Sequence, residues 1–196
     1  MDKPAIRKEA FARRKAQDDK DAVSRRIIER FVALPAYGAA QTVLWYVDAR
    51  SEVRTRHDLP AALKSGKSVI VPWCNDAGEL ELFRLESMEE LEVGMYSILE
   101  PRAELRSLSE KQVDVTTLDL IMVPGVGFDR EGGRTGHGKG YYDKLMQHAR
   151  PDAPLVAICF ECQLFDAIPM DDHDIYMDAV VTEDAVYEGK GRASGA

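Results

Sequence analysis

The hydrophobic residues of the first 34 positions recur at helical spacing. Residues 3–17 and residues 21–34 each carry apolar side chains on one stripe, including Ile6 and Ile27. This pattern predicts two amphipathic helices that meet near residues 18–19.

Further along the chain, short apolar runs replace the helical stripe. Their β-branched and aromatic content predicts strands at residues 42–47, 68–71, 118–123, 155–160 and 179–182. Helical patterns lie between some of them, at residues 51–64, where Pro60 marks a break or a new start, and at residues 141–149. Strands that alternate with helices predict an α/β fold, a mostly parallel sheet with helices on both faces in a Rossmann-like three-layer arrangement.

Two regions depart from this alternation. Pro72 closes the second strand, and a turn at residues 75–78 followed by alternating residues predicts a hairpin whose second arm is residues 79–85. Residues 87–106 carry few periodic signals and predict loops with a short helix.

Length and composition favour one soluble domain. A chain of 196 residues that is 45% hydrophobic can bury a single sizeable core. We expect residues 1–190 to form it, with residues 1–34 packed on it as helices and residues 191–196 as a disordered tail. The net charge of −8 argues against nucleic acid as a partner. No apolar run matches a membrane span or a signal peptide, so we expect a cytoplasmic monomer.

The three cysteines pose a question of redox or metal chemistry. Cys159 and Cys162 form a CxxC pair, and Cys74 stands alone. The pair ends an apolar run rather than beginning a helix, and a zinc site would need two further ligands. Buried structural cysteines are therefore favoured.

The segment from residue 124 to residue 143 contains seven glycines together with Arg134 and Lys139. It lies between a predicted strand and a predicted helix, where backbone N–H groups and a helix dipole can bind phosphate. It matches neither GxxxxGK[ST] nor GxGxxG. A flexible connection would explain the glycines, but the many hydrogen-bonding side chains of residues 134–143 favour an anion site.

This segment also carries a family resemblance. VPGVGFDREGGRTGHGKGYYDKLM resembles the signature of the 5-formyltetrahydrofolate cyclo-ligase family, also called methenyltetrahydrofolate synthetase. KPAIR, SEVRT, GMYSILEP and the closing block ICFECQLFDAIPMDDHDIYMDAVVTE resemble further family motifs in the same order. The resemblance covers nearly the whole chain.

The resemblance implies an enzyme with ATP and 5-formyltetrahydrofolate as substrates and Mg²⁺ as cofactor. ATP would phosphorylate the formyl oxygen, N10 would close the ring, and 5,10-methenyltetrahydrofolate, ADP and phosphate would be released. Two alternatives stay open: a non-catalytic relative that binds nucleotide or folate, and an ATP-dependent enzyme that acts on another small amide. The first would be favoured by loss of charged site residues, but Lys3, Arg134, Lys139 and Asp143 are all present.

The resemblance also implies a role for individual residues. Arg134 and Lys139 would be catalytic, and Asp143 and Asp174 would hold the metal. The implied ATP-binding residues are Lys3, Arg7, Arg134, Thr135, Gly136, His137, Gly138, Lys139, Gly140, Tyr141, Tyr142 and Asp174. The implied folate-binding residues are Val47, Glu52, His137, Gly138, Lys139, Gly140 and Tyr141. Tyr96 is added as an aromatic residue that could stack on the pterin or line its pocket. From the residues alone, Asp174 is better explained as a surface acid in an acidic run, and Glu52 as a polar residue at a helix start, where acids are favoured.

Overall fold

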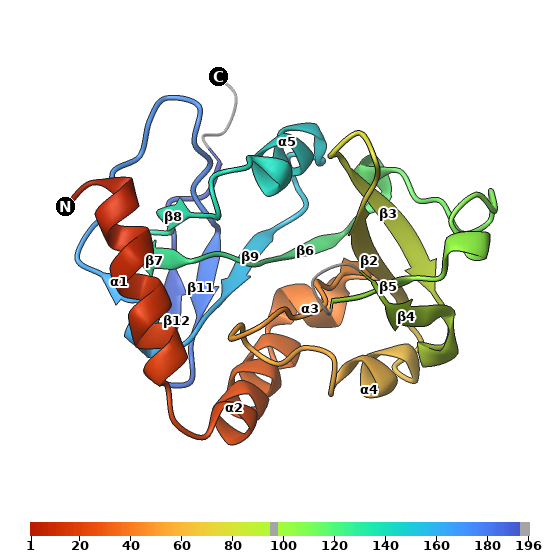
Figure 1. The fold of residues 1–196 in the computed structure, drawn as a ribbon, viewed down its shortest axis with the longest axis horizontal. Coiled ribbons are helices and arrows are strands. Elements are labelled where there is room, and N and C mark those ends of the chain that lie inside the picture. The colour runs from red at the N-terminus through yellow and green to blue at the C-terminus, as the bar shows by residue number, and fades with distance from the viewer. Residues whose placement is uncertain (95–97, 193–196) are drawn as a thin grey trace.

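A seven-stranded sheet forms the centre of the molecule. The structure, a computed structural model, describes residues 1–94 and 98–192. The sheet order is β12 (Val186–Glu188), β11 (Ala179–Val181), β9 (Leu155–Ile158), β6 (Leu120–Val123), β1 (Thr42–Leu44), β2 (Ser68–Cys74) and β3 (Leu80–Leu85). The five strands from β11 to β2 are parallel, while β12 and β3 are antiparallel edges (Figure 1).

Helices cover both faces of this sheet, which confirms the predicted fold class. One face carries α2 (Lys20–Val32), α3 (Pro35–Ala39) and α4 (Leu59–Leu63), and the other carries α5 (Tyr141–His148) (Figure 1). Alternate side chains of each strand enter the two cores. In β6, for example, Leu120 and Met122 pack with α2, whereas Ile121 and Val123 pack with α5.

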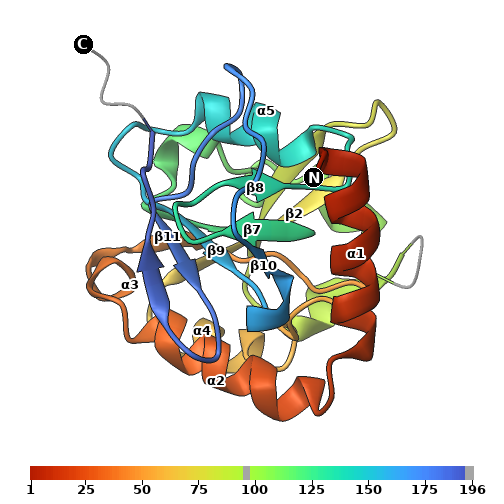
Figure 2. The ribbon, with the colours of Figure 1, turned by 90° about the vertical axis from the view of Figure 1, so that its left-hand side faces the viewer.

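The first helix, α1 (Lys3–Ala16), lies beside a second, smaller sheet instead of on a face of the large one (Figures 1 and 2). This small sheet has the order β10 (Leu164–Phe165), β7 (Gly127–Asp129) and β8 (Arg134–Thr135). The guanidinium of Arg13 on α1 lies 4.5 Å from the centre of the Phe165 ring. Two strands of this sheet come from the glycine-rich segment, so the segment is not a single loop.

The remaining elements are short. β4 (Leu91–Val93) and β5 (Leu99–Pro101) form an antiparallel pair in the region expected to be loops and a short helix. Single 3₁₀ turns are formed by η1 (Met88–Glu90), η3 (Ala103–Leu105), η4 (Val115–Thr117) and η5 (Glu161–Gln163). Tyr96 lies outside the described residues.

Two further expectations are wrong in detail. Only α4 is helical within residues 51–64, because Asp48 folds the preceding residues into a loop: it accepts hydrogen bonds from the backbone N–H of Arg56 (2.9 Å) and from its guanidinium (2.8 Å). β2 continues through Pro72 to Cys74. Its parallel partner β1 pairs only as far as Ile70, so Pro72 has a strand neighbour on one side alone.

The expected disordered tail, residues 191–196, is wrong for its first two residues, and residues 193–196 lie outside the described part of the chain. The backbone N–H of Gly191 donates to the carbonyl of Met177 (3.1 Å), and the guanidinium of Arg192 donates to the carbonyl of Pro151 (3.1 Å). Both residues therefore belong to the packed chain. Within the described ranges, no helix combines the length and apolarity needed to cross a bilayer.

All three cysteines are free thiols. Cys159 is completely buried in the core, while Cys74 and Cys162 are half-buried. Burial raises the pKa of Cys159 and of Cys162, which disfavours the reactive thiolate. This environment agrees with the structural role expected for Cys159.

Candidate active site

The glycine-rich segment and the loop that carries Glu52 leave the large sheet at the same edge. β1 and β6 are neighbouring parallel strands, so their carboxyl ends point the same way. The Glu52 loop follows β1 and the glycine-rich segment follows β6. Ligands of α/β sheets bind beyond this edge, where loops from adjacent strands meet.

The first half of the glycine-rich segment, residues 125–133, is packed tightly. A Cβ atom on Gly125 would lie 2.4 Å from the Phe128 ring, and one on Gly133 would lie 2.3 Å from Oδ2 of Asp129. The Asp129 carboxylate itself accepts hydrogen bonds from the backbone N–H groups of Gly133 (2.8 Å) and Ile168 (2.7 Å). These glycines make room for neighbouring side chains.

The second half, residues 136–140, is an open loop before α5. Gly138 has φ +89° and Gly140 has φ +70°, conformations that side chains of L-residues rarely adopt. Gly140 is the residue before the first turn of α5, and no side chain of the described residues caps this helix. The backbone N–H groups of the first turn are thus left for other acceptors. Within the segment expected to bind phosphate, residues 136–140 are the part that forms an open loop.

Arg134 is held rigidly beside this loop. It is 7% exposed, donates a hydrogen bond to the carbonyl of Pro124 (3.1 Å), and forms an ion pair with Asp143 in the first turn of α5. The neighbouring hydroxyl of Thr135 is buried and has no hydrogen-bond partner in the described part of the chain. Arg134 is therefore a fixed charge at the base of the loop.

Lys139 has the opposite environment. Its side chain is exposed, and its ammonium lies 5.7 Å from the centre of the Tyr141 ring. Among the described residues, no carboxylate lies within 4 Å of it. Lys139 is thus available to an incoming anion.

Lys3 and Arg7 reach this region from α1, whose N-terminus is capped by Asp2. Lys3 Nζ lies 2.6 Å from Asp171 Oδ2 and 2.5 Å from Asp174 Oδ2. Arg7 Nε donates to the carbonyl of Gly136 (2.8 Å). One helical turn separates the two cations, but they contact different partners. Lys3 contacts the acidic residues 171–174, and Arg7 contacts the glycine loop.

The electrostatics favour the charged forms of the Lys3–Asp174 pair. Burial opposes the charge on Lys3, yet its bonds to both carboxylates raise its pKa. Burial likewise opposes ionisation of Asp174, but hydrogen bonds from the Asp171 backbone and from Lys3 lower its pKa. Asp174 is accordingly a carboxylate at neutral pH.

The expected metal ligands lie in two separate groups. Ligand atoms of Asp171, His173 and Asp174 all lie within 4.8 Å of one another, in a group that does not include Asp143. Their carboxylate oxygens suit Mg²⁺, which prefers oxygen ligands. Asp143 and Asp174 are each paired with a cation expected to bind phosphate, Arg134 and Lys3.

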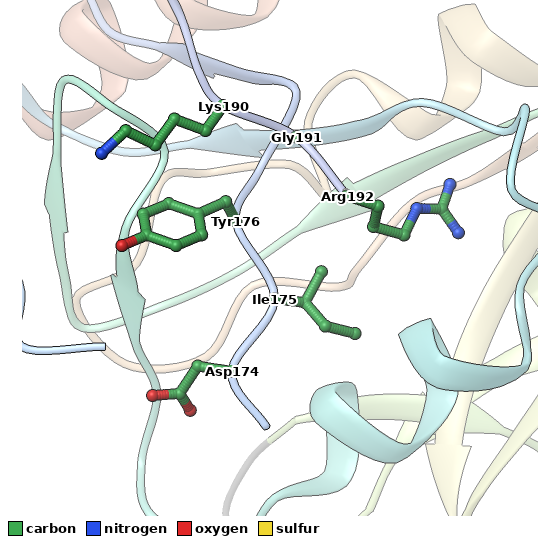
Figure 3. A pocket seen from close by; sticks show the side chains of 6 residues that line it. All are labelled: Asp174, Ile175, Tyr176, Lys190, Gly191 and Arg192. Atoms are coloured by element: carbon green, nitrogen blue, oxygen red, sulfur yellow. The ribbon is translucent and has the colours of Figure 1, made fainter. Parts of the chain in front are cut away.

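A pocket of about 330 Å³ adjoins Asp174. It is lined by Asp174, Ile175, Tyr176, Lys190, Gly191 and Arg192. Figure 3 shows Asp174, Tyr176 and Lys190 extending to one side, while Ile175 and Arg192 extend to the other. The pocket continues the surface that begins at the Lys3–Asp174 pair.

Glu52 is nearly buried on the other side of the glycine loop. One carboxylate oxygen, Oε2, accepts a hydrogen bond from the backbone N–H of Ala49 (2.9 Å). The second, Oε1, lies 3.5 Å from His137 Nε2. The fold thus joins Glu52 to the glycine loop across more than eighty residues of sequence, while Val47 packs in the core beneath.

Tyr142 is influenced both by Glu52, on the folate side, and by Arg134, at the base of the glycine loop. Its hydroxyl is buried and has no hydrogen-bond partner among the residues that the structure describes. Burial, followed by the charge of Glu52, raises its pKa, and the charge of Arg134 acts in the opposite direction. The phenol is therefore protonated and can donate a hydrogen bond.

Sequence reasoning missed Phe11, Arg14 and Asp171. Arg14 is 2% exposed and its Nη1 lies 3.9 Å from Glu52 Oε1. A signal for it existed, because Arg14 continues the spacing of Lys3 and Arg7 along one face of the helix. Asp171 carried no signal beyond its place in an acidic run.

The fold and site define a class: an α/β protein with a cationic glycine loop at the carboxyl edge of a parallel sheet. The chain belongs to the 5-formyltetrahydrofolate cyclo-ligase family, whose model matches residues 1–183. It is therefore an enzyme of the cyclo-ligase class.

Individual relatives agree with this assignment. A Schizosaccharomyces pombe protein named "Probable 5-formyltetrahydrofolate cyclo-ligase" is 36% identical over 85% of this chain and 86% of its own. The 5,10-methenyltetrahydrofolate synthetase structure from Aquifex aeolicus superposes with a TM-score of 0.82 at 31% identity, covering 100% of this chain and 97% of that one. A Mycoplasma pneumoniae synthetase shares the fold, with a TM-score of 0.73, 21% identity and coverage of 93% and 99%.

Proposed function

We propose that the protein converts 5-formyltetrahydrofolate to 5,10-methenyltetrahydrofolate with ATP, releasing ADP and phosphate. Membership of the cyclo-ligase family supports the reaction class. The observation that carries the ATP-dependent form is the pairing of charges around the glycine loop, Lys3 with Asp174 and Arg134 with Asp143.

These pairs suit a magnesium nucleotide. Each joins a cation expected to bind phosphate to a carboxylate expected to bind metal. A bound magnesium nucleotide would offer anionic oxygens to Lys3 and Arg134, and Asp143 and Asp174, from their two separate groups, would offer oxygen ligands to the metal. Both partners of each pair therefore gain a new partner of opposite charge, and the charge stays balanced.

ATP is needed because the formyl oxygen is a poor leaving group, and phosphorylation makes it a good one. The formyl oxygen attacks the γ-phosphorus of ATP, the bond from that phosphorus to ADP breaks, and an imidate-type phosphate forms. N10 then attacks the activated carbon and loses its proton to solvent, and the C–O bond breaks with its electrons on phosphate. The main task of the protein is to align the substrates and stabilise the charge on the phosphoryl group.

The residues divide this task between them. Arg134 is fixed in place and would hold the phosphoryl oxygens from the outset, whereas exposed Lys139 would close onto them. Loop residues 136–140 and the first turn of α5 would supply backbone N–H groups. Mg²⁺, held by Asp143 and Asp174, would neutralise phosphate charge.

Glu52 would bind the folate. A carboxylate can accept two parallel hydrogen bonds from the N–H edge of a pterin. His137, 3.5 Å from Glu52, belongs to the phosphate loop, so folate and ATP would meet at this contact. The hydroxyl of Tyr142 is a donor for the formyl or pterin oxygen.

Location and assembly stay predictions. We infer a cytoplasmic monomer that acts on two small molecules. One relative, from Arabidopsis thaliana, is named as mitochondrial.

The decisive experiment follows the formyl oxygen. Purified protein is incubated with Mg-ATP and 5-formyltetrahydrofolate labelled with ¹⁸O in the formyl group, and the product is measured by its absorbance. We expect methenyltetrahydrofolate and ADP in equal amounts, with the ¹⁸O recovered in inorganic phosphate. Label recovered in water would contradict phosphorylation of the formyl oxygen, and absence of product despite ATP binding would contradict the proposed substrate.

A further inference from the structure

Four side chains at the folate side form a closed ring of contacts. Arg14 Nη1 lies 3.9 Å from Glu52 Oε1, which lies 3.5 Å from His137 Nε2. The His137 ring centre is 5.4 Å from that of Phe11, and the Arg14 guanidinium is 5.2 Å from the Phe11 ring centre. The ring joins three parts of the chain: α1, the Glu52 loop and the glycine loop.

Arg14 is the most deeply buried member of this ring. Besides Glu52, its guanidinium contacts the hydroxyl of Ser51 through Nε (3.0 Å) and the carbonyl of Gly125 through Nη1 (3.2 Å). Burial lowers the pKa of Arg14, and the charge of Glu52 is the largest opposing influence. Glu52 is also the single carboxylate within 4 Å of Arg14 in the described part of the chain.

A buried guanidinium is expensive unless its charge and its N–H groups are satisfied. The adjacent Arg13 also anchors α1, but it does so from the surface. Arg13 contacts the carbonyl of Leu164 (3.2 Å) and the ring of Phe165 (4.5 Å), and it is paired with Glu9 on its own helix. Arg14 differs from Arg13 in contacting Ser51, Glu52 and the start of the glycine-rich segment.

We propose that Arg14 is a positioning residue that aims the Glu52 carboxylate at the folate and fixes the Glu52 loop against the glycine-rich segment. The proposal rests on the proposed function, in which Glu52 binds the pterin. Arg14 itself touches no reacting atom. Its loss would allow Glu52 to turn away from its place beside His137, and small displacements of a binding group have large effects.

The test compares Arg14→Met and Arg14→Lys with Arg13→Met as the matched control. We expect Arg14→Met to raise KM for 5-formyltetrahydrofolate about tenfold while KM for ATP changes less than twofold. Arg14→Lys keeps a charge but loses the fork of donors, so it should recover only part of this loss. Arg13→Met should leave both KM values unchanged.

A double-mutant cycle with Glu52→Gln separates positioning from folding. We expect the double variant Arg14→Met, Glu52→Gln to bind folate no worse than Glu52→Gln alone, because Arg14 acts through Glu52. Additive losses, or equal rises in both KM values, would overturn the inference. If the wild-type protein forms no methenyltetrahydrofolate, the proposed function fails. The same cycle is then measured by equilibrium binding of 5-formyltetrahydrofolate, and absence of coupling there overturns the inference separately.

Discussion

The two halves of the glycine-rich segment, residues 125–133 and residues 136–140, are both rich in glycine but lie in opposite environments. In residues 125–133, an added Cβ on Gly125 or Gly133 would collide with the Phe128 ring or the Asp129 carboxylate. In residues 136–140, an added Cβ on Gly138 or Gly140 would meet no atom closer than 3.8 Å, but the backbone has positive φ. Gly125 and Gly133 therefore save space, whereas Gly138 and Gly140 provide a positive φ.

This difference separates stability from function. The first half builds a small sheet on which α1 packs, and it thereby positions Lys3, Arg7 and Arg14. The second half exposes Lys139 and the backbone to a ligand. Substitutions in the two halves should consequently fail in different assays.

The largest effect is expected for Lys139→Ala in the second half. Lys139 is exposed and, within the described ranges, unpaired, so its removal should not change the free energy of unfolding. Because it removes a positive charge expected to stabilise the transferring phosphoryl group, it should lower kcat by about 10²-fold or more. Steady-state kinetics and thermal unfolding of the same sample measure both quantities.

Lys144→Ala is the matched control for this variant. Lys144 is an exposed lysine one turn into α5. Its removal should leave kcat within twofold. A nearly normal rate for Lys139→Ala would show that this lysine has no part in the reaction.

The second prediction compares one glycine from each half. Gly133→Ala forces a Cβ against Asp129 and should cost about 1–3 kcal/mol of unfolding free energy, as overpacking commonly does. Gly138→Ala has space around it but pays roughly 1–2 kcal/mol for an L-residue at positive φ. Because this strain falls on an exposed loop, it should appear mainly as a KM for ATP raised about fivefold to tenfold.

Gly38→Ala is the control for both substitutions. Gly38 lies in α3 with no atom within 4 Å of an added Cβ and without a positive φ. It should leave activity unchanged and stabilise slightly, since alanine favours a helix. Equal thermal destabilisation by Gly133→Ala and Gly138→Ala would remove the distinction between the halves.

Sequence patterns predicted the sheet well because its strands depend on local signals, and the same signals gave the expected position of the site. The β-branched runs gave the parallel strands, and the strand–glycine–helix order gave the edge of the sheet where the site lies. The pairing of Glu52 with His137 also depends on that edge, since their loops follow neighbouring strands. The family motifs supplied the roles expected of individual residues.

What could not be predicted depends on contacts distant in sequence. Residues 51–58 look helical until Asp48 is buried against Arg56, and glycine spacing does not reveal that the Phe128 ring occupies the place of a Cβ on Gly125. Arg14 looks like any cation of a basic helix, because only tertiary packing buries it. Propensity and pattern do not contain this information.

The smallest effect is expected for the ion pairs beside the second half. The side chains of Lys3 and Asp174 are 19% and 14% exposed, whereas Asp48, which pairs with Arg56, is completely buried. We expect Asp174→Asn to lower the unfolding free energy by less than about 1 kcal/mol at pH 7, as for pairs near the surface. Asp48→Asn should cost more, because it leaves buried hydrogen bonds of Arg56 weakened.

The pH dependence distinguishes the Lys3–Asp174 pair from a general packing effect. The pKa of Asp174 is lowered in the folded protein, so its contribution is present above the unfolded value of about 3.9 and disappears as pH falls through the folded value. The difference in stability between wild type and Asp174→Asn should stay constant from about pH 5 to pH 8 and vanish in stronger acid. Denaturant unfolding across this range measures it. A difference that persists at low pH would mean that Asp174 acts through packing. The Lys3–Asp174 ion pair would then no longer support the proposed magnesium-nucleotide site.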